Sequence, residues 1–437
     1  MTAYDAGATG AARDEPGITA AQQSALRKAA WRLLPILTIA YLFNYLDRTA
    51  IGVAALTMNQ DIGITNTQLG LAAGFFFISY TLCEIPSNLA LYRFGARLWI
   101  ARIMITWGIV SAATAFVTGP DSLYAVRFFL GVSEAGFFPG IAFFLSAWFP
   151  REYRTRMLAW FLVGIPASAL IGTPLSVSLL EMDGIFGLAG WKWMFIMVSL
   201  PCVILGFFVF RLLADKPEEA TWLTKDEAAG LRQMLTTETY HQPKASVVDA
   251  IFDIRVLVLA LVQFGFTLGS YGIQIWLPLI LKDFQLSNFA IGTFAIIPYL
   301  FATLGMLVWA AHVDRSGKKV VNLTLACLLG AIGLAAYTLF SSLSIALLSI
   351  SLALIGITAA RAIFWSIPPR LLTGVGAASG IAFINTVGTS GGFVGPYMMG
   401  YFRDATGGFG YGIAAMAGVM VVTTLLAASL KFTVKQE

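Results

Sequence analysis

Four charged residues lie inside stretches of the chain that are otherwise apolar. Asp47 and Arg48 interrupt one stretch, and Arg127 and Glu134 interrupt another. An ionised side chain in the hydrocarbon of a membrane is costly, so such residues usually face a protein interior or a wet cavity where a partner offsets the cost. Two acids and two bases held together can bind an anion and carry protons. We therefore place the function of the chain at these four residues.

The spacing of these residues predicts how they face one another. Arg127 and Glu134 are seven residues apart, which is about two helical turns, so both lie on one face. Asn44 precedes Asp47 and Arg48 by three and four residues, which puts its amide beside both charges. A guanidinium binds a carboxylate through two parallel hydrogen bonds and keeps its charge in any surroundings. The arginines therefore suit an anionic substrate, and the acids suit proton carriage.

The charges of the arginines and the acids predict that anion binding and proton binding are coupled. An anion that draws an arginine away from a buried acid favours protonation of that acid. The alternative is structural: Asp47–Arg127 or Arg48–Glu134 could be plain interhelical ion pairs that hold one half of the protein together.

The elements that must position these residues are membrane-spanning helices. Hydrophobic residues make up 58% of the 437-residue chain, charged residues only 12%, and the mean hydropathy is +0.78. Apolar runs near the roughly 20 residues that a spanning helix needs recur along the whole length. The predicted fold is therefore all-α and integral to the membrane, with twelve spans. They cover about 31–53, 67–91, 98–117, 122–149, 157–180, 193–213, 256–281, 288–311, 320–340, 344–367, 377–402 and 410–431.

The positive charges sort by membrane side, which argues against nucleic-acid binding despite the net charge of +5. Most lysines and arginines fall on the side that carries both termini and the long central loop. The positive-inside rule places that side in the cytoplasm, so we expect a multi-pass protein of the inner membrane with both termini cytoplasmic. Residues 1–18 are expected to be disordered, and Thr19 is expected to cap a short helix that leads into the first span.

The three cysteines, Cys83, Cys202 and Cys327, lie in different spans. None has metal-ligand spacing relative to another, so we interpret them as small buried hydrophobic residues. We expect no metal and no cofactor.

The chain divides into two related halves at a polar stretch from about Asp215 to Asp253. Tyr92–Arg97 aligns with Asp314–Lys319 at an offset of 222 residues, and the same offset carries Pro174 onto Pro396. A parallel duplication of this kind builds a central site between the halves and alternates its exposure by rocking. The expected segments are an N-terminal segment, two six-helix bundles separated by a cytoplasmic loop, and a short tail: 1–30, 31–213, 214–255, 256–431 and 432–437.

The two basic turns resemble the conserved loop motif of the major facilitator superfamily, although Tyr92 stands where an Asp is common. Further segments resemble the anion:cation symporter family, which includes proton-coupled carriers of tartrate, phthalate, 4-hydroxyphenylacetate and sugar acids. These segments are Asn44–Arg48, Glu84–Asn88, Arg127–Gly136, Phe364–Trp365, and Asn385 with Gly391–Pro396. The resemblance covers essentially the whole chain from about residue 30.

The resemblance implies roles for particular residues. In related sugar-acid carriers the acids that match Asp47 and Glu134 are the protonation sites. We expect Arg48, Arg127 and Asn44 to bind the substrate. Further candidates on other spans, each as likely to pack as to contact the substrate, are Tyr80, Ser168, Tyr271, Gln274, Tyr299, Ser366 and Asn385. Tyr80, Gln274 and Asn385 are favoured among them, partly by their position in the family. Trp276 and Pro278 are expected to shape a helix or the outer gate.

A cytoplasmic latch between the halves is expected at the ends of helices. Its members are Glu84, Arg93, Arg97, Asp314, Arg315 and Lys319. The alternative for these residues is the ordinary positive-inside bias.

Arg361 distinguishes this chain from its relatives, which generally have small or apolar residues before the Phe-Trp pair. Trp365 follows one turn later on the same face, so a cation–π contact at the edge of the pocket is possible. Our hypothesis is that Arg361 binds a second carboxylate together with Trp365. The alternative is a snorkelling or helix-bridging arginine.

These observations predict a proton-coupled symporter that imports a small organic anion by alternating access, and we expect it to be a monomer. The substrate leans to a dicarboxylate such as phthalate or tartrate, or to another aromatic or sugar acid. An anion exchanger is the alternative. Exchangers such as those for sugar phosphates are similar to a scheme with one arginine from each half, in the first and seventh spans. Here Gly269 stands 222 residues after Asp47, in the seventh span, and this span has no interior charge, so exchange is disfavoured. A membrane sensor is a weaker alternative. An enzyme is not expected, since no phosphate-binding loop or nucleophile–base pair is present.

Overall fold

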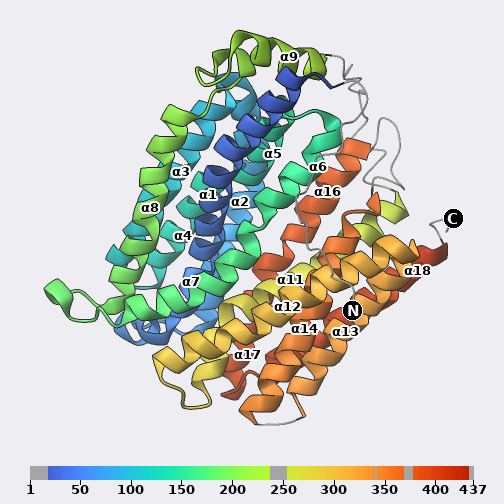
Figure 1. Ribbon diagram of the computed structural model, residues 1–437. Helices are drawn as coiled ribbons and strands as arrows, with labels where there is room; N and C mark the ends of the chain where they lie inside the picture. The colour runs from blue at the N-terminus through green and yellow to red at the C-terminus, as the bar shows by residue number, and fades with distance from the viewer. Residues whose placement is uncertain (1–17, 237–252, 340–341, 369–376, 433–437) are drawn as a thin grey trace, which may run out of the picture.

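The computed structural model describes residues 18–236, 253–339, 342–368 and 377–432. Every regular element in these ranges is a helix (Figure 1). The expected N-terminal segment up to residue 17, the loop residues 237–252 and the tail from residue 433 lie outside the described residues.

The helices of the first half follow one another in chain order. They are α1 (Ala20–Asp61), α2 (Asn66–Phe94), α3 (Ala96–Ala113), α4 (Pro120–Glu134), α5 (Phe137–Trp148), α6 (Arg151–Leu162), α7 (Gly164–Leu180) and α8 (Gly190–Leu212). The short helix α9 (Lys225–Thr236) follows them. The second half contains α11 (Ile254–Lys282), α12 (Asn288–Ser316), α13 (Lys319–Tyr337), α14 (Leu343–Phe364), α16 (Ala377–Thr389), α17 (Gly391–Thr406) and α18 (Gly410–Ser429).

The predicted fold class is confirmed. The described residues contain 11 helical spans that are long and apolar enough to cross a membrane. The one other predicted span, expected as a single helix over 377–402, consists of α16 followed by α17. Each of these helices is too short to cross a membrane alone. The break falls at Ser390, and the next residue, Gly391, packs directly against the backbone of Phe264 in α11.

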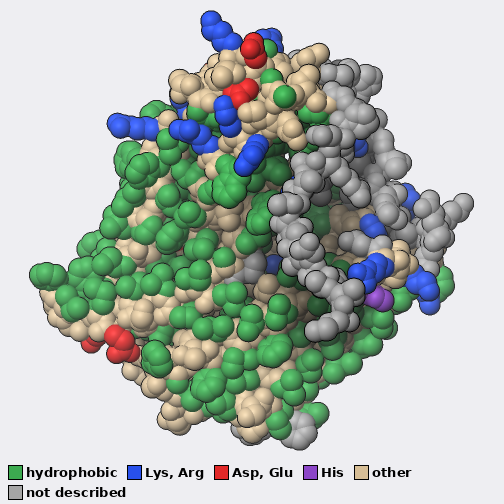
Figure 2. All heavy atoms as spheres, viewed as in Figure 1, with side chains coloured by type: hydrophobic (Ala, Val, Ile, Leu, Met, Phe, Trp, Pro, Cys, Tyr) green, Lys and Arg blue, Asp and Glu red, His purple; other side chains and the backbone are tan. Residues whose placement is uncertain are grey.

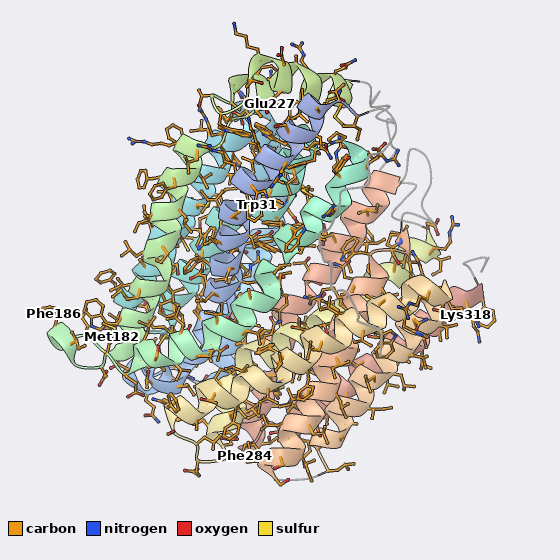
Figure 3. All side chains as sticks on the ribbon, viewed as in Figure 1. Trp31, Met182, Phe186, Glu227, Phe284 and Lys318 are labelled. Atoms are coloured by element: carbon orange, nitrogen blue, oxygen red, sulfur yellow. The ribbon has the colours of Figure 1, made fainter. Side chains whose placement is uncertain are left out.

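The two ends of the spans can be told apart by labelled residues (Figure 3). We call the end with Glu227 and Lys318 the α9 side, and the end with Met182, Phe186 and Phe284 the Phe186 side. Hydrophobic side chains cover the flanks between them, and lysines and arginines gather over α9 (Figure 2). This is the surface expected of a protein whose flanks contact lipid.

The helix α1 is longer than the sequence predicted. Thr19 is its N-cap, as expected, and forms a capping box with Gln22. The helix then continues without a break for 42 residues instead of forming a separate entry helix. Its extension is held by α9, because Glu227 accepts a hydrogen bond of 2.6 Å from Ser24 and pairs with Lys28 at 2.8 Å. These contacts between helices stabilise the extra turns.

The fourth span, expected to be continuous over 122–149, is broken beside a charged residue. Helix α4 ends at Glu134, and Gly136 has φ +85°, a left-handed conformation that glycine adopts readily. Ser87 of α2 donates a 2.6 Å hydrogen bond to the carbonyl of Ala135, which the break leaves without a helical partner. The interruption therefore fixes Glu134 at the last position of α4.

The two halves pack closely on the Phe186 side. Helices α1 and α11, α2 and α17, and α7 and α12 form the contacts across the interface. A Cβ atom on Gly52 would lie 2.1 Å from the carbonyl oxygen of Ile275, and one on Gly70 would lie 2.5 Å from that of Pro396. Small residues thus let the backbones of the two halves approach each other, as in other helical membrane proteins.

Candidate functional site

An ion pair between Arg48 of α1 and Glu134 of α4 is the centre of the candidate site. Arg48 Nε donates a 2.5 Å hydrogen bond to Glu134 Oε1, and Arg48 Nη2 contacts the same oxygen. Glu134 is fully buried, and its second oxygen has no hydrogen-bond partner among the described residues. Arg48 Nη1 also donates to Tyr271 Oη of α11 at 3.4 Å. The pair therefore lies at the interface between the halves.

Aromatic rings surround the Arg48 guanidinium. Its Cζ lies 5.5, 5.4 and 4.9 Å from the ring centroids of Tyr45, Phe76 and Tyr80. Tyr271 in turn packs edge-on against Phe77 of α2, with ring centroids 4.5 Å apart. Such rings attract a cation without neutralising it, so the guanidinium can exchange one carboxylate for another.

The other two charged residues do not pair with each other. Asp47 is 1% exposed and accepts a hydrogen bond from Ser111 of α3, while its second oxygen has no partner among the described residues. Arg127 lies over the ring of Phe76 at 5.1 Å, and its buried Nε and Nη1 atoms make no hydrogen bond within the described residues. Of the two ion pairs that the sequence suggested, the structure contains Arg48–Glu134.

The buried amide of Asn44 completes this polar cluster. Neither of its side-chain atoms makes a hydrogen bond of good geometry within the described part of the chain, and Glu134 is the acid beside it. Orphaned buried polar groups are rare in native proteins and mark functional positions. Here they surround the Arg48–Glu134 pair, so the cluster has free donors and acceptors in addition to its charges.

Three residues of α11, at different heights along the helix, contact polar or charged residues. Tyr271 reaches Arg48. Five residues earlier, the ring of Phe266 lies 5.9 Å from the guanidinium carbon of Arg361. Three residues before that, Gln263 donates to Asn385 at 3.3 Å, and Asn385 donates to Glu84 of the first half at 3.4 Å. The rise of 1.5 Å per residue spreads these levels over about 12 Å.

The remaining predicted contact residues lie at varied depths. Tyr80 and Ser168 are buried, at 7% and 3% exposure. Gln274 is half-buried, and its Oε1 has no hydrogen-bond partner within the described ranges. Trp365 is 39% exposed, and the ring beneath the Arg361 guanidinium is that of Phe266 instead of Trp365. The sequence could not show this, because it does not give the distance between α11 and α14.

The residues expected to form the cytoplasmic latch make varied contacts. Glu84 lies deeper than predicted, where it bonds Asn385. Arg93 lies over Phe94, and the backbone amide of Arg97 donates to Asp215 at 2.7 Å, so these contacts stay within the first half. In the second half, Arg315 is exposed and Lys319 begins α13, while the side chain of Asp314 lies outside the described part. The latch stays a prediction.

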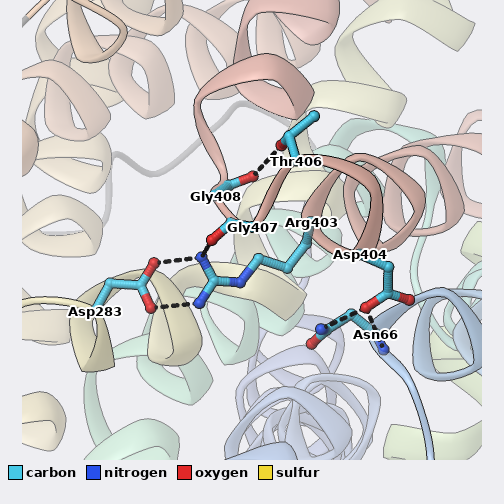
Figure 4. A network of polar contacts seen from close by, with 7 residues as sticks. All are labelled: Asn66, Asp283, Arg403, Asp404, Thr406, Gly407 and Gly408. Atoms are coloured by element: carbon cyan, nitrogen blue, oxygen red, sulfur yellow. Dashed lines mark hydrogen bonds and ion pairs between the residues drawn. The ribbon is translucent and has the colours of Figure 1, made fainter.

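A polar network on the Phe186 side was missed by the sequence reasoning (Figure 4). Asp404 of α17 accepts hydrogen bonds from the backbone amides of Asn66 and Thr67, at 3.2 and 2.7 Å, and from their side chains, at 2.7 and 2.6 Å. These residues begin α2, so the carboxylate of one half caps a helix of the other. Beside it, Arg403 forms a bidentate pair with Asp283, at 2.7 and 2.8 Å.

Lys282 adds a second link across the halves, because its ammonium donates to the carbonyl of Leu56 in α1. A signal for this closure was available in the adjacent charges at the ends of two spans, Lys282–Asp283 and Arg403–Asp404. The interface is therefore closed on the Phe186 side.

Comparisons with known proteins agree with this architecture. The Major Facilitator Superfamily profile matches residues 37–396. A protein of Agrobacterium vitis named "Putative tartrate transporter" is 46% identical, over 93% of this chain and 95% of that protein. A "Quinolone resistance transporter" of Acinetobacter baumannii is 39% identical, over 93% and 94%. The xylose transporter of E. coli, in a partially occluded inward-open conformation, superposes with a TM-score of 0.73 at 13% identity, over 92% of this chain and 98% of that one. The chain belongs to the major facilitator superfamily and is a transporter, not an enzyme.

Proposed function

We propose that the protein is a proton-coupled symporter that imports a small organic anion across the inner membrane. The observation that carries the proposal is the Arg48–Glu134 ion pair at the interface of the halves, contacted by Tyr271. The substrate site combines this pair with Arg127 and Asn44, and the α9 side faces the cytoplasm.

Exchange of partners at Arg48 couples the anion to a proton. A substrate carboxylate that binds Arg48 competes with Glu134 for the same guanidinium. Glu134 would then be a buried carboxylate without a counter-charge, which is strongly unfavourable. Uptake of a proton by Glu134 removes that cost, so the anion-bound and protonated states are favoured together. Release of the proton restores the ion pair and expels the anion.

Asp47 is the second proton site of the proposal. It is buried and accepts a hydrogen bond from Ser111 of the first half. Protonation at Asp47 therefore responds to the charge of Arg127 and Glu134 without direct contact with the substrate. We assign it to proton passage and not to anion recognition.

The names of the relatives support a substrate class for this proposal. The Agrobacterium vitis protein, 46% identical over nearly its whole length, is named for tartrate. A hydroxy dicarboxylate of this kind presents a carboxylate to Arg48 and hydroxyls to the unpartnered amides of Asn44 and Gln274. The quinolone-resistance relative raises the competing function of proton-driven export, since an ion pair of this kind serves antiport as well.

Uptake of L-tartrate into proteoliposomes tests the proposal. An acidic exterior is expected to drive accumulation, and a protonophore is expected to abolish it. Glu134→Gln is expected to lose gradient-driven accumulation while tartrate counterflow persists. Glu181→Gln, which changes an exposed acid at the end of α7, is the matched control and should behave as wild type. Accumulation that is driven by an internal anion and ignores the pH gradient would establish exchange in place of symport.

A further inference from the structure

We infer that Arg361 binds the second carboxylate of the substrate from the opposite half, so that the carrier selects dicarboxylates over monocarboxylates. This inference rests on the proposed function and names the substrate feature that the second half recognises. It depends on the surroundings of Arg361 and on the partners of the neighbouring acids.

Arg361 is a cation without a counter-charge in the described structure. It lies half-buried near the end of the apolar helix α14, and no carboxylate lies at ion-pair distance within the described ranges. Its neighbours are the ring of Phe266, at 5.9 Å, and Tyr45 of α1, with which its charge interacts across the interface. The charge of Arg361 therefore acts on a side chain of the first half.

The acids nearest to the interface have other partners. Glu134 is paired with Arg48, and Asp47 accepts from Ser111. Glu84 bonds Asn385, and the charge that acts on it is that of Arg48. A partly buried guanidinium that no internal acid neutralises is a natural receptor for an anionic ligand.

Arg361 of the second half and Arg48 of the first half share one neighbour. Both interact with Tyr45, whose ring lies 5.5 Å from Arg48 Cζ. Their contacts on α11, Tyr271 and Phe266, are five residues apart, or about 7.5 Å along the helix. Binding of one carboxylate of a four-carbon dicarboxylate at each guanidinium would place the ligand between α1 and α14. Such a ligand bridges the halves, whereas a monocarboxylate engages Arg48 alone.

Arg361 also lies in the last turn of its helix, where any cation interacts favourably with the helix dipole. Arg211 likewise lies in the last turn of its helix, α8, and is exposed. Comparison of the two arginines therefore separates ligand recognition from a general effect of charge at a helix end.

Transport of L-tartrate and of its monoamide, which replaces one carboxylate by a neutral isostere, tests the inference. Arg361→Gln is expected to raise KM for tartrate by about 10- to 100-fold, the range for loss of a charge-assisted contact, and to leave KM for the monoamide unchanged. Arg361→Lys should recover part of the tartrate affinity because the charge is retained. Arg211→Gln should leave both values unchanged.

The outcomes separate this inference from the proposed function. Equal losses for both compounds, or no loss for tartrate, would overturn the assignment of Arg361 while leaving proton symport intact. Thermal stabilisation of the purified wild-type protein by each compound gives an independent readout. If neither compound stabilises the wild type or is transported by it, the proposed function fails and the inference fails with it. If Arg361→Gln unfolds, the Arg361→Lys variant decides by the tartrate-to-monoamide ratio.

Discussion

At the scale of single residues, the two arginines of the first half differ in how their charges are compensated. Arg48 has a carboxylate, a tyrosine hydroxyl and three rings around it. Arg127 has the face of Phe76, and two of its buried nitrogens make no hydrogen bond in the described structure. Unpaired buried charge does not stabilise a fold. The position of Arg127 is therefore better explained by binding than by stability.

Replacement of Arg127 by methionine, which has similar length, tests this explanation. Arg127→Met is expected to abolish anion uptake without lowering the melting temperature, because an uncompensated buried cation is exchanged for an apolar side chain. The measurements are proteoliposome uptake and thermal unfolding in detergent. Arg102→Met is the matched control: this arginine also has a buried Nε without a partner, but it lies over Trp99 on α3, and its loss should leave uptake intact. A drop of melting temperature confined to Arg127→Met would make its role structural.

The sequence identified the four charged residues because an ionised group in an apolar span is conspicuous. It could not decide which acid pairs with which base, since pairing depends on the rotation of α1 against α3 and α4. Asp47 and Arg48 are adjacent in the chain, yet one faces Ser111 and the other faces the second half. As a result Asp47 bonds a serine while Glu134 pairs with Arg48, a difference that residue spacing alone could not reveal.

At the scale of elements, the break between α4 and α5 positions the ion pair. An uninterrupted helix was the prediction, although Pro139 follows Ala135 by four residues and has no N–H to donate to the Ala135 carbonyl. The break depends on a contact from another helix, the hydrogen bond from Ser87 to Ala135, and on the left-handed Gly136. Pro139 and Gly136 therefore signal the break in the sequence, whereas the hydrogen bond from Ser87 that satisfies the freed carbonyl depends on tertiary structure.

Substitution of Gly136 tests the role of the break. Gly136→Ala is expected to destabilise the protein by about 1–2 kcal/mol through its left-handed backbone, and further because a Cβ would lie 2.5 Å from Ser87 Oγ. Uptake should fall as Glu134 is displaced. Gly184→Ala is the control, with a similar φ of +80° and no atom within 4 Å of the added carbon. It should lower the melting temperature less and spare uptake. Equal effects of the two variants would show that backbone strain alone matters.

At the scale of the whole molecule, the duplication in the sequence predicted the two bundles, and the structure shows which side of their interface is closed. Asp404 and Lys282 join the halves on the Phe186 side. A sequence specifies both alternating states of a carrier, so it cannot indicate which of them a structure contains. The closing contacts identify a set of interactions that must break in each cycle.

Loss of the Asp404 charge is expected to shift the population toward opening on the Phe186 side, because its hydrogen bonds to the start of α2 exist in the closed state. Spin labels at Asp121→Cys and Phe289→Cys, both exposed there and on different halves, should move to longer distances in Asp404→Asn. Asp61→Asn is the matched control, since Asp61 bonds Trp191 within one half, at 2.7 Å. An unchanged distance distribution in Asp404→Asn would show that Asp404 does not hold this interface closed.

The unbroken helix α1 has a practical consequence. Its 42 residues form a rod of about 63 Å, with Arg48 along its length and α9 fixed to its first turns through Glu227. Any tilt of the first bundle must therefore carry α9 with it. Lys225 on α9 and Lys318 on the other bundle are both exposed on the same side of the molecule. A donor and an acceptor dye at these two positions would report the distance between the bundles during transport as a change in energy transfer, and the residues of the proposed substrate site would stay unchanged.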